Sequence, residues 1–102
     1  MVNRGDVWWV ALPSGRRPAL VMTRASAIPV LGRLVVVPTT TAIRSIPTHL
    51  ELDEQDGLPR RCALSFDNIT TAPKDALESF IATLSPARMA QVCRAWRLVV
   101  DC

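Results

Sequence analysis

Short apolar segments of strand length, separated by polar turns, run along most of the chain. Residues 7–12 are rich in β-branched and aromatic side chains, and Pro13-Ser14-Gly15 follows them as a turn. A second apolar strand, residues 16–23, begins directly after this turn. Two strands joined by so short a loop predict a β-hairpin.

Further segments along the chain have the length and composition of strands. Residues 33–39 are apolar and end in Pro38 and a threonine run, and residues 48–52 alternate so that Leu50 and Leu52 face inwards. The remaining strand segments are residues 62–66 and 68–71, which are either two strands or one bent strand, and residues 80–84. Turns are predicted at residues 24–32 and 53–59, and a short helical turn at residues 74–77.

One long helix is predicted, at the end of the chain. Ser85 can cap its first turn, and Pro86 suits the first helical position because a proline there loses no helical hydrogen bond. The apolar face recurs at helical spacing through Met89, Val92, Cys93, Trp96, Val99 and Val100. The opposite face is polar and carries Arg94, Arg97 and Asp101.

This order of elements indicates a mainly β fold with a C-terminal helix. Five or six short strands joined by tight turns are typical of a small closed or half-closed antiparallel barrel. Strands and helices do not alternate as a parallel sheet requires. A length of 102 residues suits one hydrophobic core, and we expect a single domain spanning residues 1–102.

The composition excludes several classes of protein. Hydrophobic residues make up 49% of the chain without any low-complexity tract, which argues against disorder. Its apolar runs are too short to span a membrane, and its first residues do not resemble a secretion signal. Cys62, Cys93 and Cys102 are an odd set without a close pair, which fits neither a disulfide-stapled domain nor a zinc site. We therefore expect a soluble cytoplasmic protein with reduced thiols.

Positive charge is concentrated in the first half of the chain. Residues 1–50 contain six arginines and one acidic residue, a net charge of +5, whereas residues 51–102 contain six basic and eight acidic residues, a net charge of −2. All but one of the 12 lysine and arginine residues are arginine, which forms bidentate hydrogen bonds with phosphate. This distribution favours a polyanionic partner over evenly scattered surface charge.

Few residues of the usual catalytic types are present. His49 is the only histidine, so one subunit cannot form a two-histidine acid–base pair. The sequence contains neither a cluster of His, Cys, Asp and Glu with metal-ligand spacing, nor a Gly-rich phosphate loop, nor a Gly-x-Ser-x-Gly motif. A reaction catalysed by this chain should need no metal ion and no cofactor.

Transesterification of RNA needs little from the protein. The ribose 2′-hydroxyl is the nucleophile and already lies beside the phosphate that it attacks, so the protein must orient the strand and stabilise charge on the phosphorane. Arg17 suits this task, because Pro18 restricts it to an extended backbone that aims the side chain. Its guanidinium can bind two phosphate oxygens at once, and a threonine hydroxyl could donate a further hydrogen bond.

A series of motifs occurs along the chain in an order and spacing that is fairly specific. They are residues 4–10 (Arg-Gly-Asp-Val-Trp-Trp-Val), 17–21 (Arg-Pro-Ala-Leu-Val), 37–40 (Val-Pro-Thr-Thr), 46–52, the pair Gly57-Leu58, and 67–71. In these segments, which span nearly the whole length, the chain resembles the MazF/PemK-type toxin endoribonucleases. One departure from the family is the turn Pro13-Ser14-Gly15, which is shorter than the polar loop of the family. The chain therefore does not predict which RNA sequence is preferred.

The resemblance implies an SH3-like barrel that pairs into a homodimer. It also implies a metal-independent, sequence-selective endoribonuclease that cuts single-stranded RNA, the toxin of a toxin–antitoxin pair, inhibited by the acidic, apolar tail of a cognate antitoxin. Arg17 and Thr40 match the family's catalytic arginine and threonine: Arg17 would stabilise charge and donate towards the leaving oxygen, and Thr40 would bind the scissile phosphate. The predicted RNA-binding residues are Ser14, Arg16, Thr39, Asp67 and Asn68.

Several assignments stay open at this point. The general base is not identified, and His49 fits a rim position better than a catalytic one. Asp67 and Asn68 are suited to reading base edges, but they also fit a polar turn between two strands. Trp8 and Trp9 alternate along a strand, so one should face the core and the other solvent.

A function of another class also fits a small basic barrel. Related barrels act by clamping another protein, such as a topoisomerase, and a plain RNA-binding barrel would bind RNA without cutting it. The discriminating observation is whether Arg17 and Thr40 are required for growth inhibition.

Overall fold

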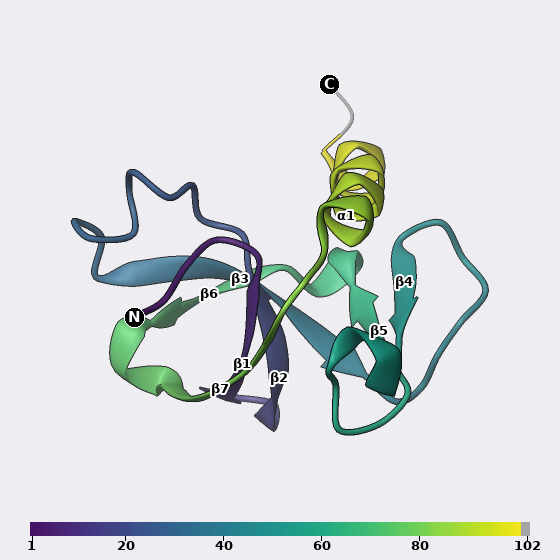
Figure 1. Ribbon diagram of the computed structural model, residues 1–102, viewed down its shortest axis with the longest axis horizontal. Helices are drawn as coiled ribbons and strands as arrows, with labels where there is room; N and C mark the ends of the chain where they lie inside the picture. Colours follow the sequence, from purple (N-terminus) through teal and green to yellow (C-terminus); the bar gives the residue numbers. More distant parts are fainter. Residues whose placement is uncertain (101–102) are drawn as a thin grey trace.

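The computed structural model describes residues 1–100, so the predicted polar position Asp101 and the third cysteine, Cys102, lie outside the described residues. Within them the chain forms β-strands, short 3₁₀ turns and one C-terminal α-helix, which confirms the mainly β class (Figure 1). The strands are β1 (Asp6–Leu12), β2 (Gly15–Val21), β3 (Arg33–Thr40), β4 (His49–Leu52), β5 (Cys62–Ser65), β6 (Thr70–Pro73) and β7 (Leu77–Thr83). The helical elements are η1 (Glu54–Asp56), η2 (Phe66–Asn68), η3 (Lys74–Ala76) and α1 (Pro86–Val99).

The predicted hairpin of β1 and β2 is present. The two strands pair antiparallel from Val7 with Leu20 to Leu12 with Gly15, which leaves Pro13 and Ser14 as a two-residue turn. Gly15 has a φ of +123°, a conformation that side chains other than glycine rarely adopt. The turn is therefore tight, and it places the start of β2 directly beside the end of β1.

Strand β3 holds the sheet together. Arg33–Val36 pair with β6, residues 36–38 pair with β2, and residues 39–40 pair with β5, all antiparallel. The strand was predicted over residues 33–39 with Pro38 and the threonine run at its end, and it continues one residue further, to Thr40. Pro38 lies between the stretches that pair with β6 and β5, so its missing N–H interrupts neither of those two pairings.

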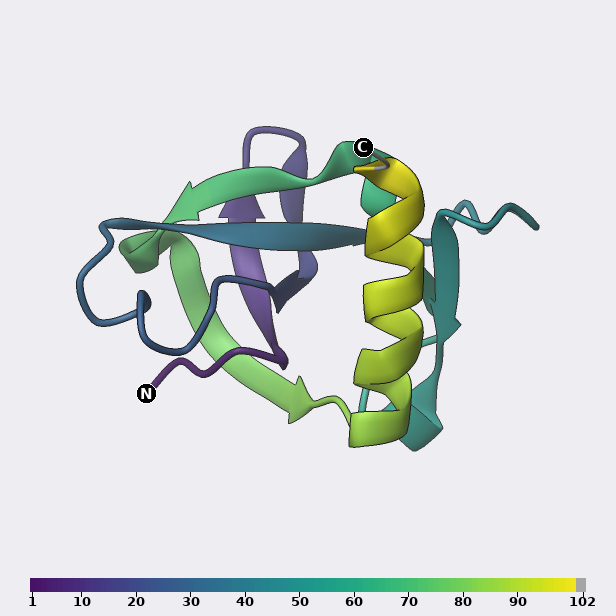
Figure 2. The same cartoon turned by 90° about the horizontal axis from the view of Figure 1, so that it is seen from above.

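The strands form a barrel-like sheet that is not closed. Its order is β4-β5-β3-β2-β1-β7, with β6 paired to β3 beside this path. Strands β1, β2, β3, β6 and β7 curl around one side of the molecule, whereas β4 and β5 extend from the end of β3 on the other side (Figures 1 and 2). The expected small antiparallel barrel is thus confirmed, in its half-closed form.

Two hydrophobic clusters fill the two faces of this sheet. One contains Val10, Ala19, Val21, Leu34, Val36, Ala72 and Leu77, which lie inside the curled strands. The other contains Val7, Leu20, Val37, Leu52, Leu64, Phe66, Val92 and Ala95, which lie between the sheet and α1. Neighbouring residues of β2 and β3 alternate between the clusters, as the period of two in a strand requires. Both faces are therefore buried at residues 19–21 of β2 and at residues 36–37 of β3.

Helix α1 covers the junction between the curled strands and the β4–β5 pair (Figures 1 and 2). The predicted N-terminus is confirmed: the Ser85 hydroxyl accepts a hydrogen bond from the Arg88 N–H at 3.1 Å, and Pro86 is the first helical residue. The predicted apolar face is mostly correct, but Val100 is 44% exposed and Ala95, which the pattern omitted, is buried.

Boundaries differ from prediction in the second half of the chain. Residues 62–71 form two strands separated by η2 rather than one bent strand. The last strand begins at Leu77 rather than at Phe80, because pairing of Leu77 with Val10 extends the β1–β7 ladder past two irregularities in register. No helix within residues 1–100 is long and apolar enough to cross a membrane.

Candidate active site

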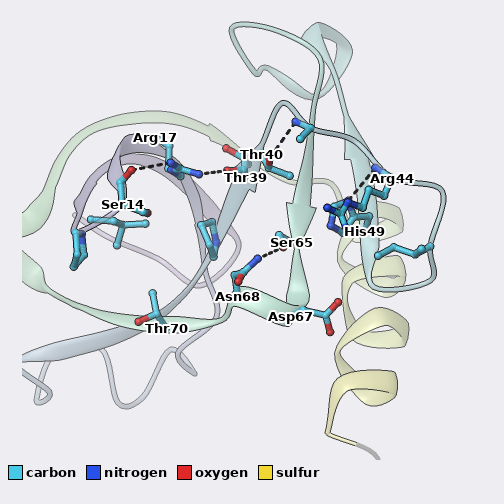
Figure 3. A pocket seen from close by; sticks show the side chains of 15 residues that line it. Ser14, Arg17, Thr39, Thr40, Arg44, His49, Ser65, Asp67, Asn68 and Thr70 are labelled. Carbon is cyan, nitrogen blue, oxygen red and sulfur yellow. Dashed lines mark hydrogen bonds between the residues drawn. The ribbon is translucent and has the colours of Figure 1, made fainter.

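A polar pocket of about 560 Å³ opens where the β1–β2 turn, the end of β3 and the β5–β6 connection meet. Figure 3 shows its labelled side chains, with Thr39 and Thr40 between Arg17 and the Arg44–His49 pair. The polar residues that line it are Ser14, Arg17, Thr39, Thr40, Arg44, His49, Ser65, Asp67, Asn68 and Thr70. We call this space the first pocket.

Two main-chain carbonyls hold the guanidinium of Arg17 at the first pocket. Nη2 donates to the carbonyl of Ser14 at 3.0 Å, and Nη1 donates to the carbonyl of Thr39 at 3.3 Å. Nε is buried and has no hydrogen-bond partner among residues 1–100. Because each terminal nitrogen carries two N–H groups, one on each is left to bind an anion. The short turn and the end of β3 thus orient the arginine.

The neighbouring threonines use their hydroxyls differently. Thr39 is 4% exposed, and its Oγ1 donates to the carbonyl of Pro18 at 2.8 Å. The Oγ1 of Thr40 instead accepts a hydrogen bond from the Ala42 N–H at 3.1 Å. A hydroxyl that accepts one bond keeps its own proton for donation. Thr40 can therefore donate to an anion bound by Arg17, whereas Thr39 supports Arg17 through its carbonyl.

The predicted pair Asp67 and Asn68 lies across the first pocket on η2. The Asp67 carboxylate accepts a hydrogen bond from the Thr48 hydroxyl at 2.6 Å, and the Asn68 side-chain amide donates to the Ser65 hydroxyl at 2.7 Å. Both residues are exposed apart from these contacts. The structure is therefore compatible with both interpretations of this pair: the residues form a turn between β5 and β6, and both line the first pocket.

His49 lies at the side of the first pocket, next to Arg44 (Figure 3). Its Nδ1 accepts a hydrogen bond from the main-chain N–H of Arg44 at 3.2 Å. The neutral ring then carries its proton on Nε2 and is a donor there rather than a base. Sequence reasoning missed Arg44, Ser65 and Thr70 as lining residues. The pairing of His49 with Ser65 across β4 and β5, and of Thr70 with Val36 across β6 and β3, brings such distant positions together.

Arg16 points away from the first pocket, as expected for the neighbour of Arg17 in an extended strand. Its guanidinium carbon lies 4.4 Å from the centre of the Trp9 ring, and its Nε forms an ion pair with Glu78. Trp8 packs against the hydrophobic cluster inside the curled strands, so one tryptophan faces the core as expected, but Trp9 is half-buried rather than exposed. Trp8 packs edge-on against Phe80, whose ring centre is 5.9 Å away.

Cys62 lies beside Thr39, at the end of β3. It is buried, and burial, followed by the negative charge of Asp56, raises the pKa of its thiol to about 11, while a hydrogen bond with Thr39 acts in the opposite direction. Cys62 and Cys93 are both free thiols. Nucleophilic chemistry needs the thiolate, so a buried thiol with a raised pKa is a structural residue.

The hydrogen-bonding groups of this pocket have the chemistry that binding of a phosphodiester would require. Arg17 and Thr40 present donors from one side, and a mixed set of donors and acceptors faces them from η2, β4 and β5. Donors fixed before a ligand arrives stabilise negative charge well, because they do not have to reorganise.

Comparison by sequence places the chain among known toxins. Residues 3–100 match the family model described as PemK-like, MazF-like toxin of type II toxin-antitoxin system. The chain is 38% identical over 102 residues to the probable endoribonuclease MazF2 of Mycobacterium tuberculosis, covering 99% of this chain and 100% of that protein. It is also 38% identical over 101 residues to the probable endoribonuclease MazF5 of the same species, covering 97% and 93%.

Comparison by structure agrees with the comparison by sequence. The fold superposes on the Mycobacterium tuberculosis toxin MazF-mt6 with a TM-score of 0.88 and 28% identity, covering 94% of this chain and 96% of the toxin. It superposes on a mycobacterial endoribonuclease in complex with its cognate antitoxin with a TM-score of 0.89 and 28% identity, covering 99% and 96%.

Proposed function

Because the chain belongs to the PemK-like, MazF-like toxin family of type II toxin–antitoxin systems, we propose that it is a metal-independent, sequence-selective endoribonuclease acting on single-stranded RNA. One observation carries the proposal. Arg17 is held by two carbonyls at the edge of a polar pocket, beside the Thr40 hydroxyl, which keeps a proton for donation. Such an arrangement suits a phosphodiester with its two free oxygens.

The reaction is a transesterification within the RNA. The ribose 2′-oxygen loses its proton and bonds to the adjacent phosphorus, and the bond from phosphorus to the 5′-oxygen breaks. The 5′-oxygen takes up a proton, so the products are a 2′,3′-cyclic phosphate and a 5′-hydroxyl. Arg17 stabilises the charge of the phosphorane and donates towards the leaving oxygen, and Thr40 binds the scissile phosphate.

The opposite side of the first pocket is proposed to read the RNA. Asp67 and Asn68 carry an acceptor and an amide side by side, which suits the edges of unstacked bases. On the Arg17 side, Ser14 contributes its exposed hydroxyl, and outside the first pocket Arg16 binds the flanking backbone. Thr39 acts from beneath, through the carbonyl that positions Arg17.

The partners follow from the family. We propose that the chain is one toxin domain spanning residues 1–102, that it acts in the cytoplasm as a homodimer, and that a cognate antitoxin inhibits it. A solved relative is an endoribonuclease in complex with its cognate antitoxin, which supports this partner. The acidic, apolar tail of the antitoxin would compete with RNA for the arginines of the first pocket.

The test is cleavage of single-stranded RNA by purified protein in EDTA. We expect cuts with 2′,3′-cyclic phosphate ends, identified by mass spectrometry and end-mapping. Arg17→Ala should lower the rate at least about 100-fold, and Arg17→Lys should recover part of it, because lysine keeps the charge but not the paired donors. Arg24→Ala is the matched control, since it removes an arginine outside the first pocket.

Two outcomes would refute the proposal. One is intact RNA across varied sequences when circular dichroism shows the wild-type protein to be folded. The other is growth inhibition that persists unchanged in both Arg17→Ala and Thr40→Ala, which would favour the clamp on a protein target.

A further inference from the structure

A second pocket lies on the other side of Arg17, Thr39 and Thr40. It has a volume of about 480 Å³, and Arg17, Thr39 and Thr40 line both this pocket and the first one. Its other lining residues are Trp9, Arg16, Pro18, Thr41, Pro59, Arg60 and Cys62. We call this space the second pocket. The catalytic pair proposed above therefore stands between two cavities.

The charges of the two pockets differ. The first pocket contains the carboxylate of Asp67 and several neutral polar groups besides its arginines. The second pocket is lined by three arginines and by no acidic residue. None of the ion pairs within residues 1–100 involves Arg60. Glu78 pairs with Arg16, but Arg17 and Arg60 form no ion pair within residues 1–100, and their positive charge favours binding of a phosphate over recognition of a base edge.

Arg16 is oriented before any ligand binds. Its Nε is paired with Glu78, and its plane lies over Trp9 with 4.4 Å between the guanidinium carbon and the ring centre. The Arg16 side chain is still 51% exposed, and its terminal nitrogens form no hydrogen bond within residues 1–100. An arginine fixed at Nε and at its face offers its terminal N–H groups at low entropic cost.

A single strand bound at Arg17 and Thr40 must continue on both sides of them. We propose that the second pocket binds the nucleotide next to the scissile phosphate, and that Arg16 and Arg60 bind its flanking phosphate. This inference rests on the proposed function, since it takes Arg17 and Thr40 as the place of cleavage. The first pocket then recognises the base sequence, and the second holds the backbone of any sequence.

The experiment compares binding of RNA of different lengths. The RNA is centred on the mapped cut and carries a 2′-deoxy nucleotide there, which prevents cleavage. One version ends at the two nucleotides that flank the scissile phosphate, and two others extend it by two nucleotides on the 5′ or the 3′ side. Fluorescence anisotropy gives the Kd of wild type, Arg16→Ala, Arg60→Ala and the control Arg24→Ala.

We expect each second-pocket variant to weaken binding about fivefold to tenfold for RNA extended on one side only. The same variants should bind the shortest RNA like wild type, and the slope of log Kd against log salt should fall by about 0.7 for the extended RNA. Arg24→Ala should match wild type throughout. Equal loss with every RNA, no loss with any, or the same loss in Arg24→Ala would overturn the inference.

A second measurement separates the two proposals. Mixed-sequence RNA with 2′-O-methyl groups cannot be cut, and its binding tests Arg16 and Arg60 without reference to a cleavage site. If wild type cleaves RNA but both variants bind this RNA normally, the second pocket is not a nucleotide subsite. If wild type cleaves nothing while both variants bind it less tightly, the proposed function fails but the pocket still binds RNA.

Discussion

Thr39 and Thr40 occupy neighbouring positions at the end of β3, and the alternation of a strand sends their side chains in opposite directions. Thr39 points into the core side and bonds Pro18, whereas Thr40 is half-buried with its oxygen fixed by the Ala42 N–H. The orientation of its hydroxyl therefore allows Thr40, and not Thr39, to donate a hydrogen bond to an anion.

This difference predicts the effect of substitutions at Thr40. Thr40→Val keeps the shape but removes the hydroxyl, and we expect kcat to fall about 100-fold because a donor to the phosphorane is lost. Thr40→Ser should stay within about fivefold of wild type, since the hydroxyl remains. Single-turnover cleavage is the measurement, with Thr71→Val, outside both pockets, as the control. Equal rates for the Val and Ser variants would contradict the role of the hydroxyl.

Because of Cys62, we expect the free energy of unfolding to fall at alkaline pH. Its thiol pKa is about 11 in the folded protein and 9.0 as the ordinary value, so above pH 9 the unfolded chain loses a proton that the folded chain keeps. The free energy of unfolding should therefore fall between pH 9 and 11, by at most about 3 kcal/mol. Urea denaturation at several pH values measures this fall.

The matched variant for this prediction is Cys62→Ser, which keeps a small polar side chain but does not ionise in this range. We expect the free energy of unfolding of the variant to fall less between pH 9 and 11, because the variant lacks the ionisation of Cys62. The chain contains no tyrosine, so tyrosine ionisation does not obscure the slope. Parallel curves for wild type and variant would show that the thiol does not control it.

At the scale of elements, the turn after η1 depends on glycine. Gly57 has a φ of +92°, and a Cβ placed on it would lie 2.7 Å from the Cβ of Ala82 in β7. Gly57→Ala should lower the free energy of unfolding by about 2 kcal/mol or more, from the strained φ and the close contact together. Chemical denaturation tests this. Gly32→Ala is the control and should change stability by less than about 1 kcal/mol, because nothing lies within 4 Å of its Cβ.

Elements with a local cause were predictable from the sequence. The β1–β2 hairpin follows from its short turn, and α1 follows from Ser85, Pro86 and its apolar period. The end of β3 and the start of β7 were not, because they depend on pairing with distant strands. Pro38 is tolerated inside β3 only because of where β5 and β6 pair with that strand.

The candidate site also contains a residue that the sequence predicts and contacts that it does not predict. Arg17 could be selected because the following proline and the strand start lie beside it in sequence. Its carbonyl partner Thr39 and the whole second pocket arise from contacts between segments far apart in the chain, whereas its other carbonyl partner, Ser14, lies only three residues away. Local patterns select the side chain that we propose to be catalytic, but the fold determines which groups orient it.

At the scale of the whole molecule, β3 is the strand that connects the curled strands with the β4–β5 pair. Its side chains also belong to both hydrophobic clusters, Val36 to one and Val37 to the other. Neither half of the molecule can open fully while this strand stays in place. The halves should therefore unfold as one cooperative unit rather than separately.

Amide hydrogen exchange would reveal this coupling. The main-chain amides at the centre of β3 should exchange only through global unfolding, so their protection should equal the free energy of unfolding measured by denaturant. Thr39, whose carbonyl accepts one of the two hydrogen bonds that hold the Arg17 guanidinium, belongs to that strand. The orientation of the arginine would then last as long as the folded state itself, and any partner that loosens this segment would have to work against the stability of the entire fold.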